Sequence, residues 1–257
     1  MLPPLDRANA MTLVARWVQA PYGCGLLFRS SARLSMRRLF CLLLALSFLH
    51  AGAVAAPPGN RPTPGYVRVA IETSVGTIIV AVDQKRAPRT AANFLTYVDD
   101  GRFDGVTFYR AARRKSDPGY GLIQGGIDTD ARRSLPPIRH EPTTQTGIKH
   151  LDATLSMARP NRPNSAMGNF FITIGPTPNM DARGDYIGYA AFGHVVGGMD
   201  VVRKILAVPT CCGSGPMRGQ MIVRPIVILR ARRLDGTPRP TRGVKPWLIG
   251  LHKKTAK

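Results

Sequence analysis

The sequence has few acidic residues, and this shortage sets the first limits on function. Its 257 residues include 15 Asp and Glu against 36 Lys and Arg, so the formal net charge is +21. Without residues 1–56 the chain keeps 30 basic and 14 acidic residues, a net charge of +16. Such a charge first suggests nucleic acid as a partner. The basic residues, however, are spread along the chain and concentrated at its C-terminal end, so we expect no nucleic-acid partner.

Cysteine is equally scarce. Cys24 and Cys41 lie in the first 56 residues, which leaves the adjacent pair Cys211-Cys212 in the remainder. Adjacent cysteines cannot connect distant segments, and the sequence therefore excludes a disulfide framework. A strained vicinal disulfide, two free thiols and a metal contact all stay open for this pair. We expect a loop pair without a catalytic role.

Signatures of several catalytic classes are missing. The sequence contains no G-x-S-x-G elbow, no P-loop, no H-E-x-x-H and no C-x-x-C, which argues against the corresponding hydrolases, nucleotide enzymes and redox proteins. The histidines beyond residue 56 show no metal-ligand spacing, and we expect them to be structural or exposed. They are His140, His150, His194 and His252.

The apolar run from Leu39 to Leu49 is too short for a lasting membrane anchor. It follows the basic pair Arg37-Arg38, and Ala53-Val54-Ala55 supplies a small-residue cleavage site. This order is typical of a secretory signal peptide. The arginine pair also resembles a twin-arginine signal, but its flanking residues favour ordinary secretion. We predict a signal peptide over residues 36–56, cleaved near Ala55, and export to the periplasm.

The rest of the chain divides by composition. Residues 1–35 precede Met36, which could itself serve as the translation start, and we assign this N-terminal extension no fold. Residues 57–65 form a Pro-rich linker, and residues 66–234 form one domain. Between residues 230 and 257 there are nine basic residues and one acidic residue. We expect residues 235–257 to be a flexible, solvated basic tail, able to make weak contacts with anionic lipid or cell-wall polymer.

Short β-type runs dominate the predicted domain. Helical spacing of apolar residues occurs only after Pro88 and over residues 199–206. Many short strands with two well-separated helices predict a closed or sandwiched antiparallel sheet with helices at its ends. The expected strands cover residues 66–73, 77–82, 106–109, 122–124, 154–157, 169–174, 190–196 and 222–229.

Five segments, taken in order, resemble one family. They are "PRTAANFLTYVDDGRFDGVTFYR", "LIQGG", "LSMAR", "FFITIG" and "YAAFGHVVGGMDVVRKI". Their order and spacing over residues 66–234 resemble the cyclophilin-type peptidyl-prolyl cis-trans isomerases, particularly the secreted bacterial branch. The resemblance implies a mainly β fold, a closed antiparallel eight-stranded β-barrel capped by two α-helices. It also implies a shallow groove that needs neither metal nor cofactor, with proline-containing unfolded or nascent exported polypeptides as substrates. We expect a monomer.

The resemblance also assigns site residues. Arg110 matches the catalytic arginine, whose fixed cation favours a twisted X–Pro amide. Gln124 would orient both this arginine and the substrate backbone. Phe171 would be the floor of the proline pocket, because it alternates along a strand with Phe170, which faces the other way. The remaining predicted substrate-binding residues are Leu122, Met180, Tyr189, Tyr120, Ala158, Arg159, Asn169 and Tyr109.

Several positions depart from the family pattern. Tyr109 stands where the family has His, and Asn169 replaces a longer Gln. Gly121 occupies the place of the pocket phenylalanine, and we expect Tyr120 to substitute if the backbone bulges. Asn179 stands at the usual Trp, which predicts weak cyclosporin binding. The connection from Arg110 to Gln124 is longer than usual and basic, and it could restrict or extend the groove.

Three functions follow, in order of preference. The first is isomerisation of X–Pro bonds, which assists folding in the cell envelope. The second is a non-catalytic chaperone or assembly module that binds proline-bearing segments in the same groove. The third is a basic cell-envelope protein that acts through its charge. Binding without turnover would identify the second, and salt-sensitive lipid affinity that survives loss of Arg110 would identify the third.

Overall fold

The structure is a computed structural model that describes residues 63–248. The predicted signal peptide, the N-terminal extension, most of the linker and residues 249–257 lie outside the described residues. Among residues 63–248, no helix is both long enough and apolar enough to cross a membrane.

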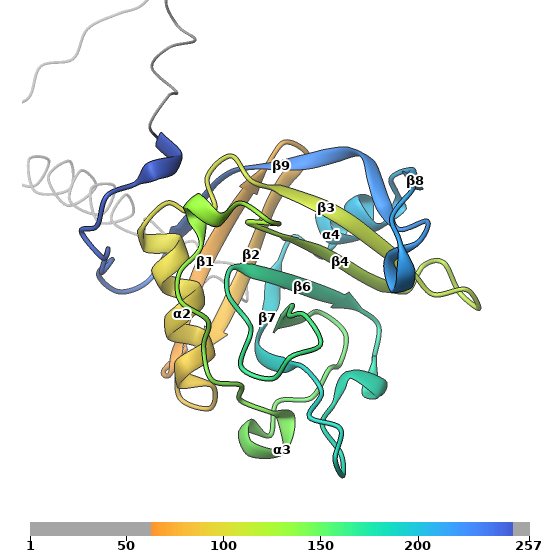
Figure 1. Cartoon of the computed structure of the whole chain (residues 1–257), viewed down its shortest axis with the longest axis horizontal. Helices are drawn as coiled ribbons and strands as arrows, with labels where there is room; N and C mark the ends of the chain where they lie inside the picture. Colours follow the sequence, from red (N-terminus) through yellow and green to blue (C-terminus); the bar gives the residue numbers. More distant parts are fainter. Residues whose placement is uncertain (1–62, 249–257) are drawn as a thin grey trace, which may run out of the picture. The chain divides into compact units, whose positions relative to one another are not determined.

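An antiparallel sheet closes on itself to form the body of the molecule (Figure 1). The strand order is β1-β2-β7-β5-β6-β4-β3-β9, and a second pairing of β1 with β9 closes the barrel. The predicted closed eight-stranded antiparallel barrel is therefore confirmed. A ninth strand of two residues, β8, pairs with the start of β9 and was not expected. The strands are β1 Tyr66–Thr73, β2 Gly76–Asp83, β3 Thr107–Arg113, β4 Gly121–Gly126, β5 Thr154–Met157, β6 Asn169–Ile174, β7 Ala190–Gly197, β8 Thr210–Cys211 and β9 Met221–Arg233.

Aromatic rings fill the barrel beneath helix α2 (Pro88–Asp99). Phe94 of this helix contacts Phe103, Phe170 and Phe192, with ring centroids 5.2–5.4 Å apart. The helix begins with Pro88 in its first turn, where the missing N–H costs no helical hydrogen bond. Its apolar stripe then faces inward and closes one part of the barrel.

A second helix, α4 (Met199–Ala207), packs on β2, β3, β4 and β6 with one apolar face. Gly198 precedes it with a φ of 80°, a conformation that favours glycine. The two predicted helices are thus present. Shorter helical turns were not predicted; they are α3 Thr143–Thr146 and the 3-10 turns η1 Ala131–Arg133, η2 Pro178–Met180, η3 Gly215–Met217 and η4 Pro246–Leu248.

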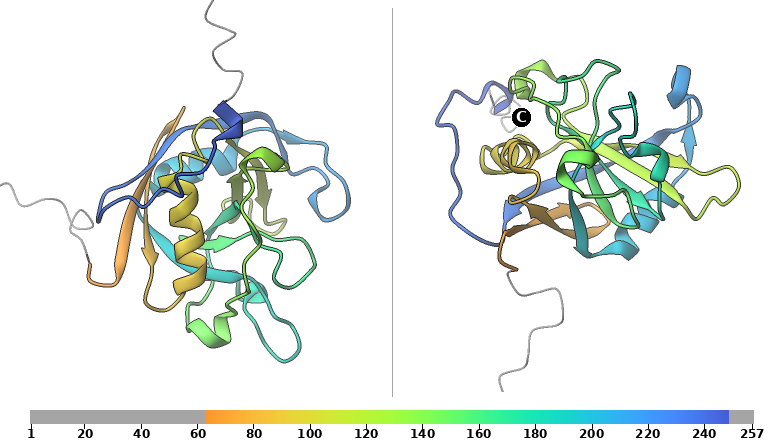
Figure 2. Two further views of the ribbon diagram at one scale, coloured as in Figure 1. Left: turned by 60° about the vertical axis from the view of Figure 1, so that its left-hand side comes forward. Right: turned by 90° about the horizontal axis from the view of Figure 1, so that it is seen from below.

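The start of the expected tail is ordered and packs on the barrel domain. Figure 2 shows this dark-blue segment running beside α2. Asp235 pairs with Arg68 (2.8 Å), and the backbone N–H of Thr241 donates to Asp100 at the C-cap of α2 (2.7 Å). Trp247 is 5% exposed and lies under the guanidinium of Arg102, 4.6 Å from its ring centroid. The flexible interpretation is therefore wrong for residues 235–248, because a tryptophan and several polar groups hold them in place.

Candidate active site

Arg110 lies on β3, between Gln124 of β4 and Met221 of β9. A bulge interrupts β3 between Phe108 and Arg110. Phe108 and Ala111 belong to the barrel core. In a regular strand neighbouring side chains alternate between faces, and a bulge re-aims them. Here it puts Tyr109 and Arg110 on the same side, where both contact the side chain of Gln124.

Two glutamine side chains hold the guanidinium of Arg110. Its Nη1 donates to Gln124 Oε1 (2.8 Å), while Nε and Nη2 donate to Gln220 Oε1 (2.9 and 2.7 Å). The predicted pair of Arg110 and Gln124 is therefore in direct contact. Gln220 was missed, because it follows a long loop and no sequence motif marks it.

Burial shapes the electrostatics of this cluster. It lowers the pKa of Arg110 and raises the pKa of Tyr109 to about 12. Both bonded partners of the guanidinium are neutral amides. Arg110 therefore keeps its full positive charge in a partly dry environment, where a charged hydrogen bond is stronger than in water.

A small apolar cluster, separate from the barrel core, lies beside Arg110. Leu122, Ala158 and Phe171 are its buried members, and Ala112, Met180 and Tyr189 pack against them. The rings of Phe171 and Tyr189 meet edge to face, with centroids 5.5 Å apart. Phe170, by contrast, lies in the barrel core. The predicted division between Phe170 and Phe171 matches this placement.

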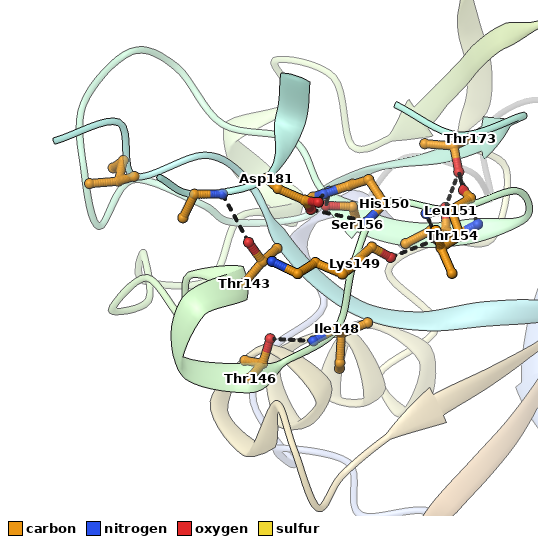
Figure 3. A network of polar contacts seen from close by, with 12 residues as sticks. Thr143, Thr146, Ile148, Lys149, His150, Leu151, Thr154, Ser156, Thr173 and Asp181 are labelled. Carbon is orange, nitrogen blue, oxygen red and sulfur yellow. Dashed lines mark hydrogen bonds and ion pairs between the residues drawn. The ribbon is translucent and has the colours of Figure 1, made fainter. Parts of the chain in front are cut away.

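A buried polar network centred on His150 (Figure 3) lies against Phe171, on whose ring the imidazole stacks. The imidazole of His150 lies 2.7 Å from Asp181 Oδ1 through Nδ1 and 2.9 Å from Ser156 Oγ through Nε2. A hydroxyl, an imidazole and a carboxylate in series are the parts of a nucleophilic triad. His150 is only 1% exposed and Ser156 is fully buried, so no substrate reaches them. The network is structural, as expected for a lone histidine, and it joins Phe171 to the segment that carries Met180.

Tyr120 does not form the pocket wall. It is 41% exposed and packs over Gly175, with the Arg114 guanidinium 5.4 Å from its ring centroid. Gly121 has a φ of +148°, and a Cβ there would meet the Ala112 carbonyl oxygen at 2.0 Å. Tyr120 is therefore not part of the apolar cluster of Leu122, Ala158 and Phe171. Ala112, which the sequence did not single out, packs against the cluster instead.

Other predicted binding residues are occupied by contacts within the chain. The Asn169 side chain accepts from the Asp128 N–H and donates to the Asp128 carbonyl, each at 2.8 Å. The N–H of Ala158 donates to the Asn169 carbonyl (2.9 Å). Arg159 donates to the Gly188 carbonyl (2.7 Å) and stacks on the ring of Tyr189. These contacts fix the Asn169 amide against Asp128 and leave one of its two N–H groups without a partner among residues 63–248.

The basic loop after Arg110 is also tied down. Arg113 donates to the carbonyls of Leu206 and Val208 at the end of α4 (2.8 and 3.0 Å). Arg114 donates to the Pro176 carbonyl (2.8 Å). These two arginines brace the loop against the barrel domain.

The cysteine pair is joined. Cys211, the last residue of β8, and Cys212, the first residue after it, form a disulfide, which leaves neither thiol free. Within residues 63–248, no group of three or more His, Cys, Asp or Glu side chains could hold a metal ion.

Comparison with known proteins agrees with this geometry. Residues 68–232 match the family described as cyclophilin type peptidyl-prolyl cis-trans isomerase/CLD. Peptidyl-prolyl cis-trans isomerase A of Dickeya dadantii is 36% identical over 166 residues, 64% of this chain and 83% of that protein. Peptidyl-prolyl cis-trans isomerase B of Escherichia coli is 33% identical over 147 residues, 55% and 85% of the two chains.

The fold has solved counterparts. A cyclophilin-type isomerase of Cryptosporidium parvum, crystallised in the presence of the dipeptide Ala-Pro, is 21% identical, with a TM-score of 0.51 over 66% of this chain and 99% of that one. At this identity the likeness concerns the fold alone. The family match and the relatives decide the assignment: this chain belongs to the cyclophilin-type peptidyl-prolyl cis-trans isomerases.

Proposed function

We propose that Arg110 is the catalytic residue of this isomerase and that Gln124 orients it. Rotation about an X–Pro bond is slow because the nitrogen lone pair is delocalised into the carbonyl, with a barrier of ~18–20 kcal/mol. In the twisted transition state the nitrogen regains its lone pair. A fixed cationic N–H group can donate to that nitrogen only in the twisted state, so it lowers the barrier without tightening ground-state binding.

One observation carries the proposal: the Arg110 guanidinium is fixed by neutral partners next to the apolar cluster of Leu122, Ala158 and Phe171. Of its five N–H groups, three have partners; one on Nη1 and one on Nη2 have none among residues 63–248. Shortening isomerisation from roughly 100 s to a millisecond requires about 7 kcal/mol of transition-state preference. A positioned charge, together with an apolar site for the proline ring, is of the right kind to supply it.

The substrates we propose are proline-containing exported polypeptides before or during folding. Phe171, Leu122 and Met180 would hold the proline ring, with Tyr189 at the rim. The predicted signal peptide over residues 36–56 supports a periplasmic setting. Cell fractionation and N-terminal sequencing would test this location. A cytoplasmic protein that still begins before residue 36 would contradict it.

The test of the chemistry is cis–trans exchange of a short X–Pro peptide, measured by NMR with the purified chain. We expect Arg110→Ala to lower kcat/KM at least tenfold and Arg110→Lys to restore only part of it, because ammonium lacks the planar fork. Arg224→Ala is the matched control, since Arg224 is an exposed arginine of β9. If the folded wild-type chain binds the peptide without accelerating exchange, it is a binding module instead.

A further inference from the structure

Gln220 makes more hydrogen bonds to Arg110 than the predicted partner Gln124 does. Its Oε1 accepts from both Nε and Nη2, at 2.9 and 2.7 Å, whereas Gln124 accepts from Nη1 alone. The Nε–H bond matters because Nε lies at the base of the guanidinium plane. A partner at one Nη lets the plane pivot, but partners at Nε and at both Nη atoms fix its orientation.

The Gln220 amide is itself held in one orientation. Its Nε2 donates to the Pro216 carbonyl (3.0 Å), so the donor end faces a carbonyl and the acceptor end faces a cation. Exchanging the amide oxygen and nitrogen would leave both ends mismatched. The backbone is fixed as well: the Gln220 N–H donates to the Met217 carbonyl, and its carbonyl accepts from the Ala111 N–H (3.0 and 2.9 Å).

The loop that presents Gln220 is anchored at its start by the cysteine pair. Cys211 pairs across the ladder with Met221, the residue that also pairs with Arg110. Cys212 has a φ of 53°, and its carbonyl accepts from the Gly219 N–H, immediately before Gln220. The segment from Cys212 to Gln220 therefore closes on itself, and its last residue meets the guanidinium.

We propose that Gln220 is a positioning residue for the isomerisation, acting through Arg110. This inference rests on the proposed function of Arg110. An arginine side chain is long and has many rotamers. Rotamers other than the one observed would move the guanidinium away from the proposed pocket. A neutral amide fixes the guanidinium without cancelling its charge, which a carboxylate in the same place would do.

The variant Gln220→Leu tests this role, because leucine keeps most of the volume and removes the acceptor. We expect kcat for an X–Pro peptide to fall about tenfold with KM within twofold of wild type, since positioning acts on the transition state. Gln84→Leu is the matched control at an exposed glutamine of the β2–α2 connection. It should leave both constants unchanged.

A measurement without turnover separates positioning from general stability. The Nε–H of Arg110 should give an NMR signal that exchanges slowly with water in the wild-type chain. In Gln220→Leu that exchange should be at least tenfold faster, while thermal unfolding confirms a folded protein. In Gln220→Glu, which restores an acceptor oxygen, the signal should stay protected.

The outcomes are distinct. If the wild-type chain fails to accelerate cis–trans isomerisation of the X–Pro peptide, the proposed function fails. The hydrogen-exchange rate of the Arg110 Nε–H still reports whether Gln220 holds Arg110. If the wild-type signal exchanges as fast as that of an exposed arginine, the inference is wrong even if the variants fail to fold. Unchanged kcat in folded Gln220→Leu would overturn it, as would a rise in KM alone, which indicates substrate binding.

Discussion

The imidazole ring of His150 lies parallel to the phenyl ring of Phe171, with centroids 5.9 Å apart and planes at 11°. Phe171, which we propose as the floor of the proline pocket, therefore rests on a buried polar side chain. Asp181 and Ser156 hold the two ring nitrogens, so the imidazole cannot rotate without breaking a hydrogen bond. Asp181 also follows Met180 directly, which ties the pocket wall to its floor.

This arrangement predicts a loss of stability in mild acid. Burial lowers the pKa of His150 more than the neighbouring carboxylate of Asp181 raises it. An unfolded histidine takes up a proton near pH 6.5, and folded His150 does so only at lower pH. The unfolded state therefore binds more protons below about pH 6.5, and the free energy of unfolding falls as pH falls. Urea unfolding at pH 7.5 and 5.5 measures this, above the range where ordinary carboxylates titrate.

Burial lowers the pKa of His140 and His194 too, so His150 accounts for only part of the effect. In His150→Asn the difference in unfolding free energy between the two pH values should be smaller than in wild type. An equal difference would show that His150 does not titrate between folded and unfolded states in this range.

Tyr109 is predicted to act through its hydroxyl, which accepts from Gln124 Nε2 at 2.8 Å. Tyr109→Phe removes this acceptor and leaves a half-buried amide donor unpaired, a loss of about 1 kcal/mol. We expect kcat/KM to fall about fivefold. Tyr120→Phe is the control, because Tyr120 lies outside the pocket, and it should have no effect. If Tyr120→Phe proved the more harmful change, the placement of the two tyrosines would be wrong.

The same hydroxyl sets an alkaline limit on stability. Burial raises the pKa of Tyr109 to about 12, whereas an unfolded tyrosine ionises near pH 10. The contribution of the protonated Tyr109 hydroxyl to the free energy of unfolding is fully present below pH 10 and is lost as the pH rises towards 12. Burial raises the pKa of Tyr97 as well. The number of tyrosines that stay protonated at pH 11 in the folded chain, followed by absorbance at 295 nm, should therefore be one lower in Tyr109→Phe than in the wild-type chain.

Gly121 cannot carry the phenylalanine usual in the family. Gly121→Ala should lower the free energy of unfolding by about 2 kcal/mol or more, because of its φ of +148° and the close Ala112 carbonyl. Gly184→Ala provides the comparison: φ is +53°, but nothing lies within 4 Å of the added Cβ. It should cost only about 1 kcal/mol. Equal losses in the free energy of unfolding at both positions would show that the close Ala112 carbonyl does not add to the strain at Gly121.

Local patterns in the sequence predicted an antiparallel sheet, closed or sandwiched, with helices at its ends, and the family resemblance added the closed eight-stranded barrel that the structure has. Alternation separated Phe170 from Phe171, because one side chain lies in the barrel core and the other in the small apolar cluster with Leu122 and Ala158. The helices showed their apolar spacing, and the first of them its terminal Pro88. The resemblance then placed Arg110 beside Gln124, where the structure has them 2.8 Å apart.

What the sequence could not predict depends on contacts between distant segments. Gln220 lies 110 residues from Arg110 and comes close only because β3 pairs with β9. His150 meets Asp181 only after the barrel closes. The direction of Tyr120 depends on a glycine φ that has no local signature. The ordered C-terminal segment was hidden by its composition, since basic and proline-rich stretches are usually solvated.

That segment leads to the last prediction, in which Trp247→Ala loosens the C-terminus without affecting catalysis. The indole is buried under Arg102, and the guanidinium of Arg133 lies 5.8 Å from its ring centroid. Losing this burial and the cation–π contacts should lower the free energy of unfolding by about 3 kcal/mol, or roughly 6–12 °C in Tm.

Val244→Ala is the control, since Val244 is an exposed apolar residue of the same segment. Its effect should be within about 0.5 kcal/mol. Both variants should keep the wild-type kcat/KM, because the segment contacts α2 and η1 rather than the pocket; equal melting temperatures for the two would show that the segment adds no stability.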